Sequence, residues 1–321
     1  MTARQVNPYF PLVILLVAVM AAALLFGQVR LFPWTDESWN TLLGFRLPRV
    51  LFAAVNGAVL ALAGTLYQIA LRNPLAEGFT TGAASSAALG GCLALALWGN
   101  PLLVSLSALL CAGLGVFTVC GVAARAASGG RVTIILAGIA LSVMAGAGIS
   151  FLKYFFEDSL STMVFWLMGG LYAATFGKAL LLLAALGLAM LFLLRRRSEL
   201  GLMFLDDQSA RASGVNVRAL RGALFVLTTA LVALSVSFCG VIGFLGLMAP
   251  HAVRALIGHG VMVQLICSPL LGAAALTLFD LISRTILPEG GELPVGIITS
   301  AAGGCFFFIL LLRKGGRVWG S

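Results

Sequence analysis

The stretch RLPRVLFAAVNGAVLALAGTLYQIALRNPLAEG, residues 46–78, decides the fold class. Its mainly apolar part runs from Leu47 to Leu71 and is bounded by arginines on both sides. An α-helix needs about 20 mainly apolar residues to cross the hydrocarbon core of a bilayer, so this run is long enough to span one. The polar segment that follows, Arg72 to Gly78, contains an Asn-Pro pair, which is typical of a turn. The stretch therefore predicts a transmembrane helix followed by a turn.

The rest of the chain has the same character. Of its 321 residues, 61% are hydrophobic and only 10% are charged, and the mean hydropathy is +1.08. A soluble domain carries roughly a quarter of its residues as Asp, Glu, Lys and Arg. The composition therefore indicates a membrane protein and excludes free cytosolic enzymes and disordered modules. The net charge of +9 comes from basic residues scattered among apolar runs, without the continuous stripe that a nucleic-acid backbone requires. We therefore expect no nucleic-acid partner.

Ten apolar runs of about membrane-spanning length follow one another along the chain. They cover residues 8–27, 47–71, 79–98, 101–124, 132–152, 178–194, 222–240, 241–257, 261–282 and 293–312. Between the fifth and sixth runs, Ser161 to Tyr172 is too short to cross and is expected to form an interfacial or re-entrant helix. The polar connections are too short to hold a soluble domain. Residues 1–321 are therefore predicted to form one all-α, polytopic transmembrane domain.

The basic residues predict the orientation of the chain. With the N-terminus in the cytoplasm, most Lys and Arg residues lie at the inner ends of the spans, among them the cluster Arg195-Arg196-Arg197. Cytoplasmic loops of membrane proteins carry an excess of Lys and Arg. An even number of spans with both termini in the cytoplasm satisfies this tendency, whereas the opposite orientation would place the cluster outside.

The sequence lacks motifs for catalysis, metal binding and nucleotide binding. The six cysteines lie in apolar surroundings, without C-x-x-C spacing or a neighbouring His cluster, and are expected to be packing residues. No G-x-x-x-x-G-K-[ST] motif is present, so the chain is not expected to hydrolyse ATP itself. We therefore expect no catalytic residue, no metal site and no cofactor on this chain.

Charged pairs mark the predicted outer ends of several spans. Arg46 and Arg49 are three apart and share one face of a helix, and no partner for them is evident in the sequence. They are either interfacial arginines that extend toward the headgroups or a docking point for an acidic partner outside. Asp280 and Arg284 are four apart, so they can pair on a continuous helix.

The inner connection from Leu202 to Val217 is amphipathic and predicts a short cytoplasmic helix. Asp206 or Asp207 can cap its N-terminus, and Gly214 can end it in the left-handed conformation. Such a helix lies either on lipid headgroups or on a cytoplasmic protein, and the acidic pair argues against anionic lipid. In the eighth run, Pro250 leaves a helical carbonyl without its usual donor, so a neighbour must bind that carbonyl.

Several motifs taken together resemble one known family. They are Arg46-Leu47-Pro48-Arg49, Gly57 and Gly64 with Gln68, Arg72-Asn73-Pro74-Leu75-Ala76, Leu136-Ala137-Gly138, Trp166 with Met168-Gly169-Gly170, Ser209-Ala210-Arg211 with Gly214, Gly243-Phe244 with Gly246-Leu247 and Pro250-His251, and Glu292-Leu293-Pro294-Val295-Gly296. In this order and spacing, over nearly the whole chain, they resemble the FecCD-like permease subunits of type II ATP-binding cassette importers for iron chelates (siderophores), haem and cobalamin.

The resemblance implies a fold, a set of partners and a function. The fold is an inverted repeat of transmembrane helices, and two copies form a homodimer in the cell inner membrane with the translocation path along the two-fold axis. Two ATP-binding cassette ATPase subunits, which hold ATP and Mg, would sit on the cytoplasmic side, and a periplasmic substrate-binding protein on the other. The implied function is import of a metal chelate by alternating access, powered by the separate ATPase.

The resemblance also implies roles for individual residues. Arg46, Arg49 and Arg284 are similar to the outer arginines that receive glutamates of the binding protein. The segment 206–217 resembles the coupling helix that contacts the ATPase, through Asp206, Asp207, Gln208, Ser209, Ala210, Arg211 and Gly214. The gate and translocation path would include Asn73, Leu75, Gly130, Arg131, Val132, Trp166 and Met168. Relatives often carry small hydroxylic residues at 129–132, where this chain reads Gly-Gly-Arg-Val.

Two other functions compete with this interpretation. An ion-coupled secondary transporter needs ionisable groups near the middle of the membrane, and none lies well inside a predicted span. An intramembrane enzyme needs a buried nucleophile beside a His or a carboxylate, and the two histidines, His251 and His259, are both predicted near the inner face. The nature of the cargo stays open. The predicted outer vestibule holds Tyr154, Phe155, Phe156, Trp166 and Met168, which suit a bulky, partly apolar cargo and packing against lipid equally well.

Overall fold

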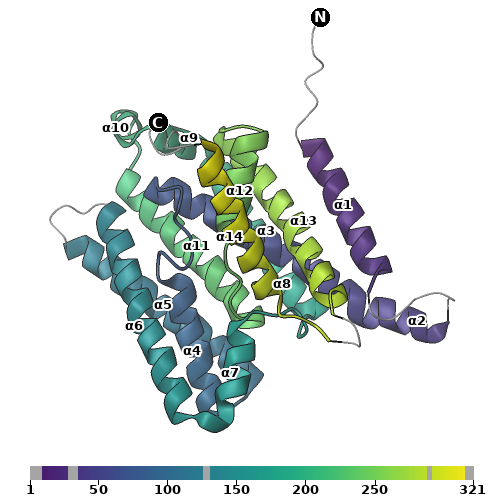
Figure 1. Cartoon of the computed structure of the whole chain (residues 1–321). Coiled ribbons are helices and arrows are strands. Elements are labelled where there is room, and N and C mark those ends of the chain that lie inside the picture. Colours follow the sequence, from purple (N-terminus) through teal and green to yellow (C-terminus); the bar gives the residue numbers. More distant parts are fainter. Residues whose placement is uncertain (1–8, 28–34, 126–130, 288–290, 315–321) are drawn as a thin grey trace, which may run out of the picture.

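The computed structural model describes residues 9–27, 35–125, 131–287 and 291–314, and every regular element in these ranges is helical (Figure 1). The helices that match the predicted apolar runs are α1 (Tyr9–Leu25), α3 (Leu47–Leu71), α4 (Ala83–Leu97), α5 (Pro101–Arg125), α6 (Arg131–Phe155), α8 (Phe176–Arg195), α11 (Val217–Cys239), α12 (Leu245–Leu256), α13 (Val261–Thr285) and α14 (Val295–Lys314). The shorter elements are α2 (Asp36–Thr41), a π-helical turn (Leu42–Arg46), a 3-10 turn (Glu157–Ser159), α7 (Leu160–Leu167), α9 (Arg197–Leu205) and α10 (Asp207–Ala212).

Within the described residues, seven helical segments are long and apolar enough to cross a membrane. They are Asp36–Leu71, which includes α3, together with α5, α6, α8, α11, α13 and Val295–Leu312 of α14. The apolar helices α1 and α4 are shorter, with 17 and 15 residues, and α12 has 12. Each of the ten predicted runs is therefore helical, while ten complete crossings stay a prediction. The helix α7 occupies the segment predicted to be interfacial or re-entrant.

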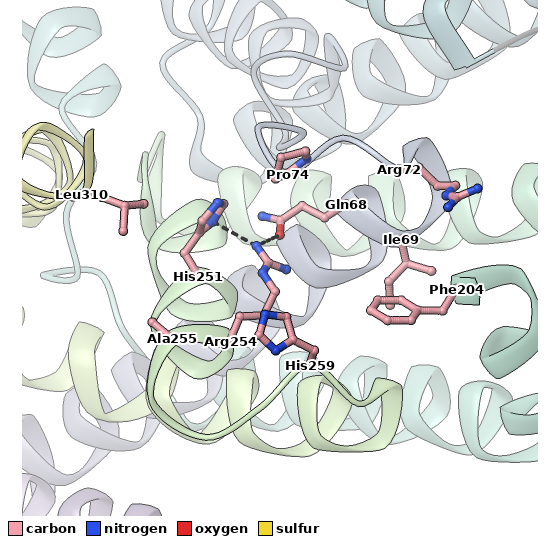
Figure 2. A pocket seen from close by; sticks show the side chains of 10 residues that line it. All are labelled: Gln68, Ile69, Arg72, Pro74, Phe204, His251, Arg254, Ala255, His259 and Leu310. Carbon is pink, nitrogen blue, oxygen red and sulfur yellow. Dashed lines mark hydrogen bonds between the residues drawn. The ribbon is translucent and has the colours of Figure 1, made fainter. Parts of the chain in front are cut away.

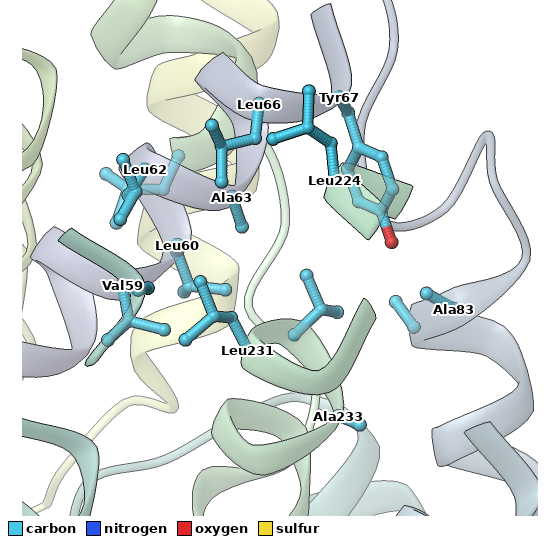
Figure 3. Packing of buried hydrophobic residues seen from close by; sticks show 14 of the residues in the cluster. Val59, Leu60, Leu62, Ala63, Leu66, Tyr67, Ala83, Leu224, Leu231 and Ala233 are labelled. Carbon is cyan, nitrogen blue, oxygen red and sulfur yellow. The ribbon is translucent and has the colours of Figure 1, made fainter. Parts of the chain in front are cut away.

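The helix α3 forms the centre of the bundle. Almost all of its residues are buried, and it packs against α13, α11, α12 and α8. Figure 3 shows residues of α3 beside Leu224 and Leu231 of α11. Within this contact the Tyr67 hydroxyl bonds to the Thr229 hydroxyl at 2.8 Å. By contrast, only 11% of the most apolar part of α6 and 22% of that of α14 are buried, so these two helices present large apolar faces outward.

Two glycines let α3 approach its neighbours closely. A Cβ added at Gly57 would collide with the carbonyl of Gly272 in α13, and one added at Gly64 would collide with the carbonyl of Gly246 in α12. Small residues at such contacts allow helix backbones to pack closely in lipid, where apolar burial gives little driving force. The glycines thus set the separation between α3 and both partners.

The contact between α3 and α12 also resolves the predicted defect at Pro250. This proline lies inside α12 and has no N–H to donate to the Gly246 carbonyl one turn earlier. The Nε2 amide of Gln68 in α3 donates to that oxygen at 3.3 Å. A neighbouring helix therefore binds the freed carbonyl, as the sequence predicted.

The bundle has two distinct ends. Figure 1 shows α9 and α10 together at one end, and α2 and α7 toward the other. We call them the α10 end and the α7 end. The α10 end carries the segment predicted to be the cytoplasmic coupling helix.

Candidate functional site

At the α7 end, four charged residues form one ionic cluster. Arg49 of α3 contacts Asp280 of α13 (Nε to Oδ1, 2.9 Å) and Glu292 ahead of α14 (Nη1 to Oε2, 2.8 Å). Arg284 lies one turn after Asp280 and pairs with it (Nε to Oδ2, 3.0 Å), as its spacing predicted. The Asp280 side chain is completely buried. We call these four residues the Asp280 cluster; it ties α3 to α13 and to the start of α14.

Two of the three predicted docking arginines also hold the end of α1. Arg46 Nη1 donates to the carbonyls of Leu24 and Leu25, at 2.8 and 2.9 Å, and Arg284 Nη2 donates to the carbonyl of Ala23 at 3.2 Å. The last carbonyls of a helix have no partner within it, so these guanidiniums cap α1. Both Arg46 and Arg49 therefore have partners on this chain, although none was evident in the sequence. The sequence did not reveal them because they are distant along the chain and, for Arg46, are backbone carbonyls.

The structure nevertheless brings the three arginines together. Arg46, Arg49 and Arg284 line one cavity of about 130 Å³ with Glu292. Arg46 and Arg284 are only 5% exposed as residues, whereas the Glu292 side chain is 35% exposed. Glu292 is thus the accessible member of this site, and docking of an acidic partner there stays a prediction.

At the α10 end, Asp206 begins the predicted coupling helix. Its Oδ2 accepts the backbone N–H groups of Gln208 and Ser209, both at 3.0 Å, and so caps α10. The Ser209 N–H is the main cause that lowers the pKa of Asp206, with the charge of Arg72 contributing. Arg72 follows α3, lies 3.6 Å from Asp206 (Nη1 to Oδ1) and also donates to the Leu205 carbonyl at 3.1 Å. The predicted cap is confirmed.

The neighbouring carboxylate, Asp207, contacts two further helices. Its Oδ2 accepts from Arg131 Nη2 of α6 at 2.6 Å and from Arg221 Nη2 of α11 at 2.7 Å. Partial desolvation would raise the pKa of Asp207, but the hydrogen bonds and charges of the two arginines outweigh it and lower that pKa. Arg221 Nε also donates to the Ala70 carbonyl of α3 at 2.8 Å. We call Asp207, Arg131 and Arg221 the Asp207 cluster.

Each aspartate thus contacts an arginine beside the first or within the second of the two predicted gate segments. Arg72 directly precedes Asn73, whose Oδ1 accepts the Leu75 N–H at 2.9 Å, and Leu75 is 41% exposed. Arg131 begins α6 and precedes Val132, which is 68% exposed. Gly130 lies outside the described residues. The side chains of Asp206 and Asp207 therefore connect the predicted coupling helix with both predicted gate segments.

The other residues of the coupling segment face outward or anchor it. Gln208, Ser209 and Arg211 are exposed, whereas Ala210 is fully buried. Gly214 follows the helix with a φ of 84°, the predicted left-handed conformation. One face of α10 is thus held on the bundle and the other is free to contact a partner.

The remaining two path residues lie at the α7 end. Trp166 of α7 rests on Gly91 of α4, where a Cβ would collide with the indole ring. Met168 ends α7 and is 37% exposed. They are separated from the gate segments by the length of the bundle, so their place on a translocation path stays a prediction.

Sequence reasoning missed Arg221, which completes the Asp207 cluster, and Arg254, which bonds to Gln68 and His251. Gln68 and His251 both belong to the motifs quoted above. Arg254 lies one turn after Pro250, on a helix that contacts α3, and this spacing was the available signal.

Comparisons with known proteins cover nearly the whole chain. Residues 9–313 match the model of the FecCD transport family. The chain is 35% identical over 285 residues to the hemin transport system permease protein HmuU of Yersinia pestis, covering 87% of this chain and 85% of that protein. It is 33% identical over 308 residues to the vitamin B12 import system permease protein BtuC of Vibrio cholerae, covering 94% and 92%.

A solved structure described as an inward-facing conformation of a putative metal-chelate type ABC transporter is similar in fold as well. It superposes with a TM-score of 0.87 at 31% identity, covering 95% of this chain and 98% of that one. The predicted resemblance is therefore confirmed at the level of the family, and this chain is a membrane permease component that belongs to the FecCD transport family.

Proposed function

We propose that this chain is the translocation subunit of an importer that moves a metal chelate, such as an iron-siderophore complex, haem or cobalamin, across the cell inner membrane. A separate ATP-binding cassette ATPase would drive alternating access from the cytoplasmic side, and a periplasmic binding protein would deliver the cargo. The family supports the class of cargo, because named relatives import hemin and vitamin B12.

The observation that carries this proposal is the double attachment of the coupling segment. Asp206 reaches Arg72 beside one gate segment, and Asp207 reaches Arg131 within the other. A movement imposed on the exposed face of α10 by an ATPase would therefore act on both segments together. This arrangement suits alternating access, in which the partner must bias one of two states of the gate.

A second copy of the chain is proposed to cover the apolar faces of α6 and α14. Both helices are mostly exposed, although they belong to a bundle whose central helix is buried on all sides. Their exposure suits a translocation path formed between two subunits. In each subunit both chain termini would lie in the cytoplasm, as the distribution of basic residues predicts.

The test is transport by the reconstituted complex. We expect uptake of a ferric chelate into proteoliposomes to need the ATPase subunit, ATP and the binding protein together. Uptake by the purified chain in response to an ion gradient alone would contradict the proposal and support a secondary transporter instead. A Walker-motif variant of the partner ATPase is the control, because it retains the assembly and removes the energy source.

A further inference from the structure

A cavity of about 340 Å³ opens at the α10 end, between the ends of α3 and α12 (Figure 2). Its lining residues are Gln68, Ile69, Arg72, Pro74, Phe204, His251, Arg254, Ala255, His259 and Leu310. We call it the Arg254 cavity. Both histidines of the chain line it, together with two arginines, and the lining contains no carboxylate.

Arg254 is fixed in this cavity by neutral partners. Its Nη2 donates to Gln68 Oε1 at 2.7 Å and lies 3.1 Å from His251 Nδ1 (Figure 2). Gln68 is itself held by its bond to the Gly246 carbonyl that Pro250 leaves free. A chain of hydrogen bonds therefore orients the guanidinium. Within the described residues, these bonds leave its Nη1 and Nε donors without a partner.

The charge of Arg254 is not neutralised in the way of three other largely buried arginines. Arg49, Arg221 and Arg284 each pair with a carboxylate. Among the described residues, no carboxylate forms an ion pair with Arg254, and Arg72 at the rim has only a partly exposed pair with Asp206 at 3.6 Å. A guanidinium removed from water and held without a counter-charge presents its donors to a planar or tetrahedral oxyanion.

We propose that the Arg254 cavity binds an oxyanion of the phosphate type, with Arg254 as the main ligand and Arg72 and His259 at the rim. The residues lie at the ends of α3 and α12 that are predicted to face the cytoplasm, and basic pockets between transmembrane helices on that side bind anionic headgroups. Apolar Phe204 and Leu310 beside the charges suit the glycerol and acyl parts of such a lipid. Inorganic phosphate shares the same chemistry. The site shares Arg72 with the contact from the coupling segment to the first gate segment, and its ligand adds to the proposed function.

The two histidines allow binding in the Arg254 cavity to be measured directly. The full chain is placed in nanodiscs of phosphatidylcholine. Peptide mass spectrometry measures the rate at which diethyl pyrocarbonate modifies exposed His259. Isotopic labelling of the histidines allows both imidazole signals to be followed by NMR. One arm adds inorganic phosphate, and a second replaces part of the lipid with phosphatidylglycerol. We expect slower modification of His259 and a shift of both imidazole signals in the lipid arm. The same response to inorganic phosphate would support the site with a soluble ligand.

Two variants separate this site from general surface charge. Arg254→Gln removes the main ligand and should abolish the protection. Arg195→Gln removes an exposed positive charge at the same end, at the end of α8, and should leave the protection intact. Equal loss in both variants, or no protection of the wild-type chain in either arm, would overturn the proposal.

Two further measurements cover the remaining outcomes. Protection of His259 by the ATPase subunit alone, in phosphatidylcholine nanodiscs without added inorganic phosphate, would also overturn the proposal. Protein side chains would then fill the cavity. If Arg254→Gln fails to fold, the imidazole signals of the wild type decide, because a site at Arg254 must move the signal of buried His251 as well as that of His259.

Discussion

The Asp280 cluster and the Asp207 cluster have the same chemistry at opposite ends of the molecule. In each, one buried aspartate lies between two arginines at ion-pair distance. They differ in what they join. Asp280 connects α3 and α13, which pack together around Gly57 and Gly272, whereas Asp207 connects the six-residue α10 to α6 and α11.

This difference teaches that the role of a buried ion pair depends on the elements that carry it. Between two helices fixed by close packing, the pair can only neutralise charge that would otherwise be stranded in the membrane. Between a short peripheral helix and the largely exposed α6, the same pair can transmit a displacement. The first is thus expected to determine stability and the second coupling.

The largest effect is expected from Asp280→Asn. The substitution leaves Arg49 and Arg284 without the carboxylate that they share, and removing one partner of a buried ion pair costs about 3–5 kcal/mol. We expect a large loss of thermal stability, measured as the unfolding midpoint of the purified chain in nanodiscs. Glu292→Gln is the matched control, because Glu292 is partly exposed and belongs to the same cluster. Equal losses in both variants would contradict the stabilising role of Asp280.

A smaller effect of another kind is expected from Asp207→Asn. It should lower the number of chelates imported per ATP hydrolysed by about tenfold, the size of a typical coupling free energy between sites, while ATP hydrolysis persists. Arg131→Gln should have the same effect because it breaks the cluster on the α6 side. Glu199→Gln, which removes an exposed carboxylate paired with Arg196 in the neighbouring α9, is the control. An unchanged transport-to-hydrolysis ratio in Asp207→Asn would refute transmission through this residue.

The sequence predicted the helices well because each apolar run had to satisfy its own backbone in lipid. The run from Leu47 to Leu71 coincides with α3, and the Asp206 cap and Gly214 stop were also local signals. Neither the apolar runs nor these helix-end signals require knowledge of which helices are neighbours.

The ionic clusters could be predicted only in part, because their partners are distant along the chain. The spacing of Asp280 and Arg284 gave one pair, but the contact from Arg49 to Asp280 crosses 231 positions. The bonds from Arg46 to the carbonyls that end α1 were not evident, because backbone carbonyls carry no side-chain signature. The Arg254 cavity likewise depends on how α12 packs on α3.

A modest effect is expected when Glu292 is neutralised. Glu292 occupies Arg49 Nη1 through both carboxylate oxygens, at 3.0 and 2.8 Å, and so competes with any acidic partner for that arginine. Exposed ion pairs contribute about 0.2–1 kcal/mol, so Glu292→Gln should tighten binding of the periplasmic protein by at most about fivefold at low salt. Arg49→Gln should weaken it. Surface plasmon resonance on the reconstituted chain measures both, and weaker binding by Glu292→Gln would exclude this competition.

The last prediction concerns pH and distinguishes the two ends. Burial raises the pKa of Glu77, between α3 and α4, to about 7, against the opposing effect of a hydrogen bond from the Phe244 backbone. The pKa in the unfolded chain is about 4.3, so the folded state holds the proton more tightly. Its contribution to stability is therefore complete below about pH 4 and is lost as the pH rises through about 7.

The unfolding midpoint of the wild-type chain should accordingly fall between about pH 5 and pH 8, and Glu77→Gln should flatten this dependence because the amide does not titrate. Glu292→Gln, at the α7 end, is the control and should keep the wild-type slope. A slope that survives in Glu77→Gln would assign the titration to another group. A flat wild-type profile would mean that the Glu77 carboxyl is ionised throughout this pH range. The α10 end would then contribute no more than the α7 end to any pH dependence of stability.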